Sequence, residues 1–300
     1  MSEDSPVDRK DEPYVFGQRH LTDDDAVWDH NAWDHVELDD EQMKLAEEKI
    51  ATQKENPVTE FNKNLYNKNP ARYWDLFYKN NENKFFKDRR WLKIEFPALF
   101  NATKPDAGPI TIFEIGCGAG NTLFPILSEN NNPDLKIIGA DYSPRAVQIV
   151  KEHELFDPKH ASAHVWDLAN PDLTLPEGVA PHSIDIIVLV FVFSALSPNE
   201  WEHAINNMAL LCKPGAQILL RDYGRYDMAQ LRFKKNRLLD ESFYVRGDGT
   251  RVYFFTEEEL AQIFSKFTIG KIATDRRLMV NRQRKLKMYR NWVQAQFFAN

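Results

Sequence analysis

The stretch Ile112-Phe-Glu-Ile-Gly-Cys-Gly-Ala-Gly-Asn121 decides the fold of this chain. It begins as an apolar strand, passes through three alternating glycines, and is expected to open a helix. Glycine permits such a tight turn because it has no Cβ atom, and for the same reason it lets the backbone approach a ligand closely. Taken alone, a G-x-G-x-G pattern fits a nucleotide-like ligand and also a purely structural turn.

Around this turn, apolar strands alternate with helices. The sequence predicts strands at 110–115, 136–140, 163–166, 184–193 and 216–220. Helix starts between them are marked by Ser143-Pro144 and by the capping box Ser197-Pro-Asn-Glu200. Strands that are apolar throughout and alternate with helices form parallel sheets covered on both faces. We therefore predict a doubly wound, Rossmann-like α/β fold.

The C-terminal part departs from this alternation. A hairpin with a Gly-Asp-Gly turn is expected at about 243–255, followed by a helix that Thr256 caps. Two further strands are expected near 267–280 and 286–298. The α/β domain would thus end in antiparallel strands.

The chain is expected to have three parts. Residues 1–13 are charged and lack apolar periodicity, which predicts a flexible acidic tail. Residues 14–100 contain irregularly spaced aromatic residues and two predicted helices, at 40–54 with Asp39 as the cap and at about 70–80. We assign these residues to an N-terminal extension, and residues 101–300 to the α/β domain.

Composition excludes several classes of protein. A hydrophobic share of 43% is enough for a core and rules out a disordered or fibrous chain. Two cysteines cannot form a disulfide framework, and the histidines and cysteines lack metal-ligand spacing, so no metal site is expected. No apolar run reaches the roughly 20 residues of a membrane span, and the acidic start does not resemble a targeting peptide. We therefore expect a cytoplasmic protein.

The net charge of −7 is unevenly distributed. Residues 1–60 carry −12, which leaves +5 for the rest of the chain. Positive charge gathers at 61–96 (+5), 221–237 (+4) and 271–290 (+7). These three patches are compatible with an RNA partner, although each also fits a solvated surface.

The glycine loop favours an adenosine-like ligand without phosphates. A dinucleotide-binding loop has a third glycine where Asn121 occurs, and this loop has it one residue earlier. No basic residue in the loop could meet a phosphate, and Glu114 is placed to meet a cationic group. These features point to S-adenosyl-L-methionine, with Glu114, Gly116 and Gly118 at the cofactor.

Acidic residues follow successive strands. Asp141 comes 25 residues after Gly116, where a carboxylate can accept hydrogen bonds from both ribose hydroxyls; the alternative is a helix cap. Asp167 and Leu168 follow the next strand and are suited to the adenine, although Asp167 could simply end that strand. Val190 lies in the apolar fourth strand and is expected to pack near the adenine or the methionine part.

The sequence resembles the tRNA N3-methylcytidine methyltransferases over about 14–298. The resemblance rests on several motifs besides the glycine loop: Phe16-Gly-Gln-Arg19, Asn31-Ala-Trp-Asp34, Tyr73-Trp-Asp-Leu-Phe-Tyr78, Phe85-Phe-Lys-Asp-Arg89, Phe191-Val-Phe-Ser-Ala195, Arg221-Asp-Tyr-Gly224 and Phe243-Tyr-Val-Arg-Gly-Asp-Gly-Thr-Arg251. The first two motifs resemble the threonine-tRNA branch. The resemblance implies a class I S-adenosylmethionine-dependent methyltransferase that forms N3-methylcytidine at position 32 of the anticodon loop.

The resemblance also implies roles for individual residues. The residues carried over by position to the cofactor site are Trp74, Tyr78, Gly116, Asp141, Asp167 and Val190. Trp74 and Tyr78 share a helix face, so they could cover the cofactor or merely pack. Phe85, Phe86 and Arg89 are expected to face the target nucleotide, with the two phenylalanines as stacking platforms or, alternatively, as core. The N-terminal extension, with Phe16, Arg19 and Trp33, is expected to bind the tRNA.

The chemistry of cytosine is consistent with this assignment. N3 carries a lone pair at neutral pH, so attack on a methyl group needs positioning and exclusion of water more than a general base. The methylated base is cationic, and Asp222 is the candidate for stabilising that charge; the alternative is a salt bridge to Arg221 or Arg225. Exposed basic residues could bind tRNA phosphates. The candidates are Arg89, Arg90, Lys234, Lys235, Arg282, Arg284, Lys285 and Lys287.

Two other functions remain open from the sequence. A methyltransferase of small molecules or proteins could share the fold, but the basic patches and the aromatic N-terminal extension would then lack a purpose. A catalytically silent RNA-binding partner subunit is the other alternative, and the intact Glu114, glycine loop and Asp141 argue against it. A protein partner such as an aminoacyl-tRNA synthetase is compatible with all of these functions.

Overall fold

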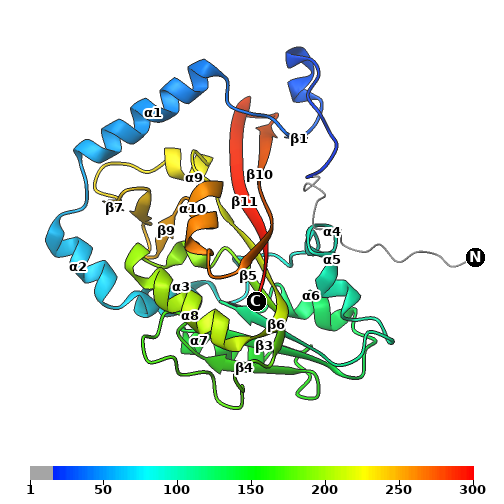
Figure 1. Ribbon diagram of the computed structural model, residues 1–300. Coiled ribbons are helices and arrows are strands. Elements are labelled where there is room, and N and C mark those ends of the chain that lie inside the picture. The colour runs from blue at the N-terminus through cyan, green and yellow to red at the C-terminus, as the bar shows by residue number, and fades with distance from the viewer. Residues whose placement is uncertain (1–15) are drawn as a thin grey trace, which may run out of the picture.

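A computed structural model describes residues 16–300, and the tail predicted at 1–13 lies outside the described residues. An eight-stranded sheet forms the centre of the molecule (Figure 1), in the order β1-β10-β11-β6-β5-β2-β3-β4. Its five parallel strands are β2 (Ile110–Ile115), β3 (Leu135–Asp141), β4 (Ala161–Val165), β5 (Ile184–Val190) and β6 (Cys212–Tyr223). This arrangement confirms the predicted parallel α/β core.

The sheet continues beyond β6 with antiparallel strands. β11 (Leu286–Phe298) pairs with β6, β10 (Thr268–Asn281) pairs with β11, and β1 (Ala32–Asp34) pairs with the outer edge of β10. The two long C-terminal strands were predicted within one residue of their observed bounds. β1 was not predicted, and through it the N-terminal extension shares one sheet with residues 101–300.

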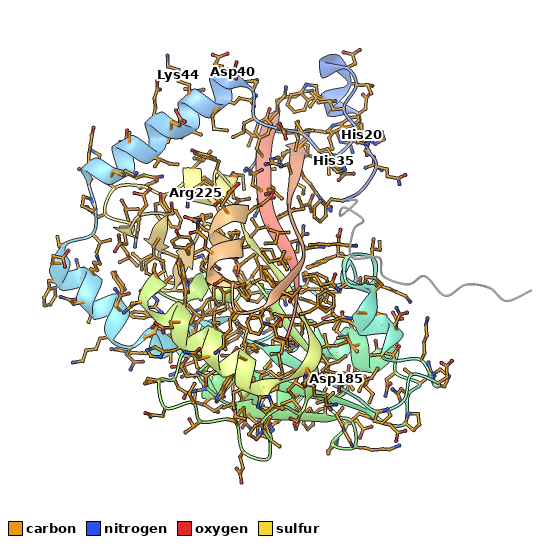
Figure 2. The ribbon with its side chains drawn as sticks, in the orientation of Figure 1. His20, His35, Asp40, Lys44, Asp185 and Arg225 are labelled. Carbon is orange, nitrogen blue, oxygen red and sulfur yellow. The ribbon has the colours of Figure 1, made fainter. Side chains whose placement is uncertain are left out.

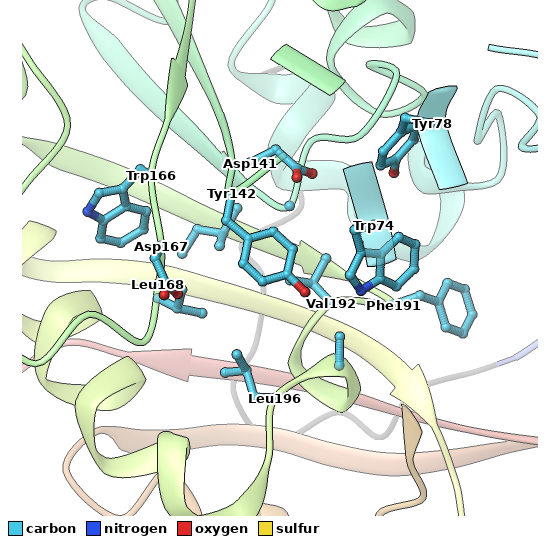
Figure 3. A pocket seen from close by; sticks show the side chains of 13 residues that line it. Trp74, Tyr78, Asp141, Tyr142, Trp166, Asp167, Leu168, Phe191, Val192 and Leu196 are labelled. Carbon is cyan, nitrogen blue, oxygen red and sulfur yellow. The ribbon is translucent and has the colours of Figure 1, made fainter. Parts of the chain in front are cut away.

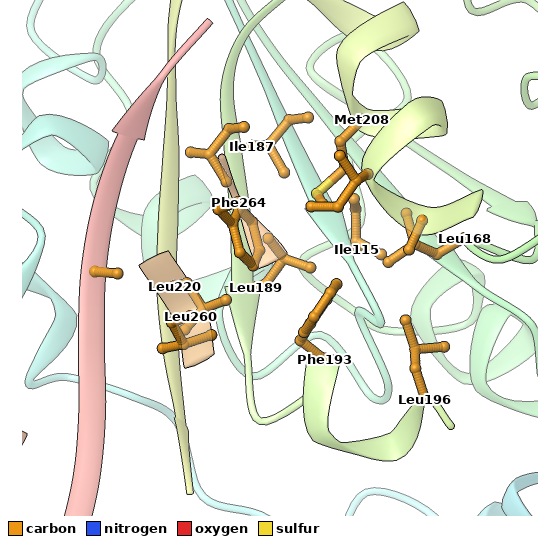
Figure 4. Close-up of a cluster of buried hydrophobic side chains, with 14 of the residues drawn as sticks. Ile115, Leu168, Ile187, Leu189, Phe193, Leu196, Met208, Leu220, Leu260 and Phe264 are labelled. Atoms are coloured by element: carbon orange, nitrogen blue, oxygen red, sulfur yellow. The ribbon is translucent and has the colours of Figure 1, made fainter. Parts of the chain in front are cut away.

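Helices cover both faces of the sheet because successive strand residues point to opposite sides. Phe113 packs on the face covered by α8 (Trp201–Leu211) and α10 (Glu257–Ile263), where Ile187, Leu189 and Phe264 also lie (Figure 4). Ile112 packs on the other face. Four short helices cover that face: α4 (Leu92–Glu95), α5 (Pro97–Asn101), α6 (Leu123–Ser128) and α7 (Pro144–Lys151).

The predicted helix caps are confirmed. Ser143 accepts a hydrogen bond from the backbone N–H of Ala146 at the start of α7. Ser197 forms a capping box with Glu200 at the short 3-10 helix η3 (Pro198–Glu200), and Thr256 does so with Glu259 at α10. These caps satisfy backbone donors that the first turn of a helix leaves unpaired.

The fourth strand is shorter than predicted. β5 ends at Val190 because Phe191 has a φ of 58°, a left-handed conformation that is rare for a bulky residue and ends strand pairing. A 3-10 turn, η2 (Phe193–Ala195), replaces the predicted end of the strand. The chain is thereby turned across the carboxyl end of the sheet.

A small second sheet contains the predicted hairpin. β8 (Phe243–Val245) and β9 (Arg251–Tyr253) pair antiparallel, as predicted, and β7 (Leu238–Asp240) adds a strand that was not predicted. A short helix, α9 (Met228–Leu231), precedes this sheet.

The helices that follow β1 run along the upper and left side of the molecule in Figure 1, whereas α4 and α5, at the end of the N-terminal extension, lie on its right side. A 3-10 helix, η1 (Asp24–Trp28), precedes β1, and α1 (Asp40–Glu55) begins at Asp39 with the predicted cap. α2 (Glu60–Lys68) was not predicted, whereas α3 (Pro70–Asn81) was. α3 contacts α7 and brings the extension to the carboxyl end of the parallel strands.

Candidate active site

A pocket of about 540 Å³, part of it open to solvent, lies between α3 and the carboxyl ends of the parallel strands (Figure 3). Ligands of open α/β sheets bind at this edge. The lining is mostly apolar, with two carboxylates. It consists of Trp74, Tyr78, Ile115, Gly116, Asp141, Tyr142, Trp166, Asp167, Leu168, Phe191, Val192, Ala195 and Leu196.

The first two glycines of the loop leave no room for a side chain at their positions. Gly116 and Gly118 have φ values of 63° and 52°, in the left-handed region that favours glycine. A Cβ atom on Gly116 would lie 2.5 Å from Val192, and one on Gly118 would lie 2.4 Å from the Tyr78 hydroxyl. The glycine loop therefore packs directly against Val192 and against Tyr78 of α3. Gly116 lines the pocket, and Gly118 lies beneath Tyr78.

Asp141 ends β3 at the pocket with only 6% of its surface exposed. Its Oδ2 accepts a hydrogen bond from the backbone N–H of Gly118 (3.0 Å), and its Oδ1 accepts one from that of Ser143 (2.9 Å). Burial raises the pKa of this carboxyl to about 6, against the opposing effect of these hydrogen bonds. The cap of α7 is Ser143 rather than Asp141, which contradicts the capping alternative for Asp141.

Asp167 and Leu168 also line the pocket, as expected for residues after β4. Asp167 Oδ1 accepts a hydrogen bond from the backbone N–H of Ala169 (2.9 Å). Trp166 is anchored because its Nε1 donates to the carbonyl of Thr174 (2.7 Å). The pocket therefore combines a carboxylate with apolar walls at this end.

Val190 occupies a different place from the one expected. It is buried in the core on the face that α6 and α7 cover and does not line the pocket. Phe191 and Val192, the next two residues, line it instead. The pocket geometry therefore does not support the expected contact of Val190 with the cofactor. The lining residues Phe191 and Val192 were not predicted from the sequence.

Three of the other missed lining residues are direct neighbours of predicted ones. Ile115 precedes Gly116, Tyr142 follows Asp141, and Trp166 precedes Asp167. Adjacency to the predicted strand ends was the signal that could have found them. Ala195 and Leu196 lie on the turn that replaces the end of the fourth strand, which the sequence analysis did not predict.

Trp74 and Tyr78 reach the pocket from α3. Their rings are stacked with centroids 6.2 Å apart, as the spacing of four residues on one helix face predicts. Tyr78 is buried, and this burial raises the pKa of its hydroxyl well above the ordinary value, so the group stays protonated. The two rings lie together at the side of the pocket that α3 forms.

Glu114 and Arg89 meet behind the glycine loop. Glu114 is buried, its Oε2 accepts from the backbone N–H of Leu123 (3.0 Å), and its Oε1 lies 3.7 Å from Arg89 Nη1. Arg89 also donates to Thr122 Oγ1 (2.8 Å). Burial raises the pKa of Glu114 to about 7, which Arg89 opposes. The cation that faces Glu114 in the structure is thus Arg89, and neither residue lines the pocket.

Asp222 is fully buried at the end of β6. Its Oδ2 accepts from the backbone N–H of Ser194 (2.9 Å) and its Oδ1 from that of Tyr223 (2.8 Å), and burial raises its pKa to about 6. Arg221 pairs with Asp275 instead, and Arg225 pairs with Glu259 at 2.8 Å. The salt-bridge alternative for Asp222 is therefore wrong.

Phe85 and Phe86 differ in exposure. Phe85 exposes 58% of its surface, and its ring packs edge-on against Phe77 and Phe86 with centroids 5.0 and 4.9 Å away. Phe86 is half-buried against the cluster formed by α3 and α7. Phe85 thus has the accessible aromatic face that stacking on a base requires.

The β10–β11 hairpin extends past the parallel strands toward the N-terminal extension (Figure 1). Lys285 and Lys287 are exposed at its tip, and Lys285 Nζ lies 4.6 Å from the centre of the Trp28 ring. Arg19 and Arg90 are exposed as well. The tip and η1 therefore form one surface with accessible cations.

Phe16 and Trp33 are buried within this part of the molecule, with 2% and 6% exposure. Trp33 packs with Leu278 and Val280 of β10, and its Nε1 donates to the carbonyl of Val27 (2.9 Å). Close by, His20 and His35 stack with centroids 5.2 Å apart (Figure 2). Trp33 thus fastens the extension to the hairpin, whereas the centre of the Phe16 ring lies 5.9 Å from the Arg221 guanidinium of β6. A direct contact of Phe16 or Trp33 with RNA stays a prediction.

Buried ion pairs join the hairpin to β6 and to the extension. Arg221 donates to Asp275 and to Gln294 Oε1 (2.6 Å). Arg277 Nε lies 3.0 Å from Asp275, and Arg277 also approaches Asp34 and Glu95 at 3.5 Å each. One connected set of charges therefore links segments that are distant in the sequence.

No group of His, Cys, Asp and Glu residues within 16–300 is arranged to hold a metal ion. Among the helices of this same range, none is long and apolar enough to cross a membrane.

The pocket fits S-adenosylmethionine. None of the described residues that line it is Lys or Arg, so its walls offer no partner to phosphates, whereas two carboxylates and aromatic rings can accept an adenosine. The parallel sheet with its antiparallel C-terminal strands, the glycine loop and the acidic strand ends define a class I S-adenosylmethionine-dependent methyltransferase. Residues 113–218 match the family model of a methyltransferase domain.

Comparison with curated proteins identifies the family. The chain is 63% identical over 290 residues to a tRNA(Thr) (cytosine(32)-N(3))-methyltransferase of Saccharomyces cerevisiae, covering 96% of this chain and 46% of that protein. It is 55% identical to a tRNA N(3)-methylcytidine methyltransferase of Schizosaccharomyces pombe, covering 94% of this chain and 91% of the relative. The chain belongs to the tRNA N(3)-cytidine methyltransferase family.

A solved structure supports the fold. A SAM-dependent methyltransferase from Anabaena variabilis superposes with a TM-score of 0.54 at 17% sequence identity, covering 82% of this chain and 97% of that one. At this identity the likeness concerns the fold alone.

Proposed function

We propose that this chain transfers a methyl group from S-adenosylmethionine to N3 of cytidine 32 in the anticodon loop of threonine tRNA. The observation that carries the proposal is the 63% identity, across 96% of the chain, to the Saccharomyces cerevisiae methyltransferase named for that nucleotide and that tRNA. The chain spans about half the length of that relative, so the tRNA is part of the proposal. The exposed cations of the hairpin tip favour tRNA over a small-molecule substrate.

The pocket residues account for cofactor binding in this proposal. Asp141 accepts hydrogen bonds from the ribose hydroxyls, because each of its oxygens keeps a lone pair after the bonds from Gly118 and Ser143. Asp167 accepts from the adenine amino group, and Leu168 packs against the ring. Trp74 and Tyr78 exclude water from the side that α3 covers. Bound there, S-adenosylmethionine supplies an electrophilic methyl group.

The protein's part in methyl transfer is then mainly positioning. Cytosine N3 has a lone pair and needs no general base, so catalysis depends on holding the ring in line and on excluding water. We assign Phe85 to stacking on the target base, with Phe86 behind it, and Arg89 to fixing the segment between them and the glycine loop. Asp222 stabilises the positive charge that the base gains.

The basic surface binds the rest of the anticodon stem-loop. Arg19, Arg90, Lys285 and Lys287 contact phosphates, and Phe16 and Trp33 hold the extension in place. We accordingly retain residues 14–100 as a tRNA-binding extension and cofactor lid, and residues 101–300 as the methyltransferase domain. A cytoplasmic location is part of the proposal, and an aminoacyl-tRNA synthetase or another protein could take part in tRNA delivery.

The test uses purified protein and tRNA from cells that lack it, because such tRNA carries other modifications and leaves N3 of cytidine 32 open. We expect incorporation of one methyl group per threonine tRNA, located at cytidine 32 by fragment mass spectrometry. Threonine tRNA with uridine at position 32, expressed in and purified from the same cells, is the matched control and should remain unmethylated. Methylation of both RNAs, or of neither, would contradict the proposal.

A further inference from the structure

The helix that carries Trp74 and Tyr78 also holds a carboxylate that neither lines the pocket nor faces solvent fully. Asp75 lies on α3, is half-buried and points toward the start of α7. Its Oδ1 accepts hydrogen bonds from Ser143 Oγ (2.9 Å) and from the backbone N–H of Arg145 (3.1 Å). A side chain of one helix therefore binds the first turn of another.

This contact completes the cap of α7. The first residue of α7, Pro144, has no N–H, the N–H of Arg145 is bound by Asp75, and that of Ala146 is bound by Ser143 Oγ (3.2 Å). A carboxylate at the first turn also interacts favourably with the helix dipole. The cap is thus divided between α7's own serine and α3.

The same loop holds the ribose-site carboxylate. Asp141 accepts from the backbone N–H groups of Ser143 and Gly118. Gly118 in turn has no room for a Cβ atom, because such an atom would lie only 2.4 Å from the Tyr78 hydroxyl oxygen. The contacts form a closed ring that runs from α3 through the α7 loop, Asp141 and the glycine loop back to α3.

The ring of contacts places two carboxylates, Asp75 and Asp141, near each other, which is electrostatically unfavourable. Burial is the main cause of the raised pKa of Asp141, and the nearby Asp75 carboxylate raises it further. A second carboxylate would be unfavourable here unless its hydrogen bonds had a structural use. The hydrogen bonds of Asp75 tie α3 to the loop that follows Asp141.

We propose that Asp75 is a positioning residue that latches α3, and with it Trp74 and Tyr78, over the cofactor pocket. Asp75 lies outside the pocket lining and acts through the α7 loop. The inference rests on the proposed function only for the methyl donor, S-adenosylmethionine, and concerns how tightly the pocket holds it.

Cofactor binding without tRNA tests the latch. Titration calorimetry with S-adenosylmethionine should show about tenfold weaker binding for Asp75→Ala, because the variant loses both hydrogen bonds that tie α3 to the α7 loop and part of their free energy is expressed in cofactor binding. Asp75→Asn should bind within about threefold of the wild type, because the amide oxygen can accept the same two hydrogen bonds. The matched control is Asp39→Ala, which removes the cap of α1 and should leave cofactor affinity unchanged.

Kinetics and hydrogen exchange separate a latch from a simple helix cap. For Asp75→Ala we expect a higher KM for S-adenosylmethionine, an unchanged KM for tRNA, and faster amide exchange across residues 70–81. An affinity within twofold of the wild type, with a loss of melting temperature like that of Asp39→Ala, would overturn the latch. Retained cofactor binding without tRNA methylation would instead contradict the proposed function alone.

Ser143→Ala provides a second route if Asp75→Ala does not fold. It removes the hydrogen bond from Ser143 Oγ to Asp75 and the serine's own cap of α7, and it leaves the bond from the Arg145 N–H to the carboxylate in place. Faster exchange across α3 and weaker cofactor binding are expected for this variant. Unchanged exchange across α3, together with unchanged affinity, would overturn the proposal.

Discussion

The cofactor side and the substrate side of the molecule are built on opposite electrostatic principles. On the cofactor side, the buried carboxylates Asp141 and Asp222 have backbone N–H partners and no ion pair, so burial raises the pKa of both to about 6. Glu114, behind the glycine loop, is the exception on this side, because it faces Arg89. The side formed by the hairpin and the extension buries its charges in pairs, with Arg221 and Arg277 around Asp275. The first arrangement leaves Asp141 as an acceptor at the pocket wall, whereas the second holds segments together.

This difference predicts which changes affect binding and which affect stability. A lone carboxylate at a pocket can be removed with a loss of ligand affinity, because no buried countercharge is left behind. Removing one member of a buried pair leaves an uncompensated charge and costs folding free energy.

The largest expected effect is on stability and concerns Arg221. Arg221→Leu should lower the free energy of unfolding by about 3 kcal/mol, because Asp275 is fully buried and keeps only its Arg277 partner. Urea denaturation gives the measurement. Lys213→Leu, which breaks a half-buried pair that solvent still reaches on the same strand, is the control and should cost less than about 1 kcal/mol. Equal losses for the two variants would remove the contrast between buried pairs and pairs that solvent reaches.

Asp141→Ala should have the next largest effect, on cofactor affinity. Loss of the carboxylate that accepts from the ribose should weaken S-adenosylmethionine binding about 100-fold, since each hydrogen bond to a charged group contributes about 1.5–3 kcal/mol. tRNA affinity should remain within about twofold, because none of the exposed cations assigned to phosphate contacts lines the pocket of Asp141. Calorimetry and filter binding measure the two affinities, with the exposed Asp157→Ala as control. Unchanged cofactor affinity would refute the assignment of Asp141.

The pH dependence of cofactor binding is the third prediction. The pKa of Asp141 is about 6, above its ordinary value, so the carboxylate that accepts from the ribose becomes protonated as the pH falls through 6. We expect S-adenosylmethionine affinity to fall about tenfold between pH 7 and pH 5. The contribution of the same group to stability changes in the opposite direction: it is present at low pH and lost as the pH rises through about 6. A flat calorimetric profile over this range would contradict the prediction.

The smallest effect is expected at the hairpin tip. Replacing Lys285 and Lys287 together by Glu should weaken tRNA binding about fivefold and reduce the dependence of log K on log salt by about 2, one for each phosphate contact. Cofactor affinity should not change. Lys159→Glu, beside the opposite edge strand β4, is the control for surface charge in general. An unaltered salt slope in the double variant would mean that the tip is only solvated surface.

The cofactor side was largely predictable because its determinants are local in sequence. The strand–glycine–helix segment and the acids after β3 and β4 are each short patterns, and the parallel sheet brings their ends to one edge. The patterns did not predict which residues at the end of a strand face the pocket. Val190 was expected at the pocket, but Phe191 and Val192 line it, because the left-handed Phe191 turns the chain there.

The substrate side was less predictable because its contacts connect distant residues. Arg221 pairs with Asp275, 54 positions later, and Trp33 packs against Leu278. A single sequence has no local sign of such partners. The strand β1 was missed for the same reason, since three residues pair with β10 only in the folded chain.

The proposal that this chain methylates N3 of cytidine 32 in threonine tRNA is tested most directly by nucleoside mass spectrometry of tRNA from cells lacking the protein. Purified threonine and serine tRNAs would be digested and their 3-methylcytidine content compared with that of cells carrying the gene. We predict loss of 3-methylcytidine from threonine tRNA, unchanged content in serine tRNA, and restoration by the wild-type chain but not by Asp141→Ala. Unchanged 3-methylcytidine in threonine tRNA would contradict the proposal.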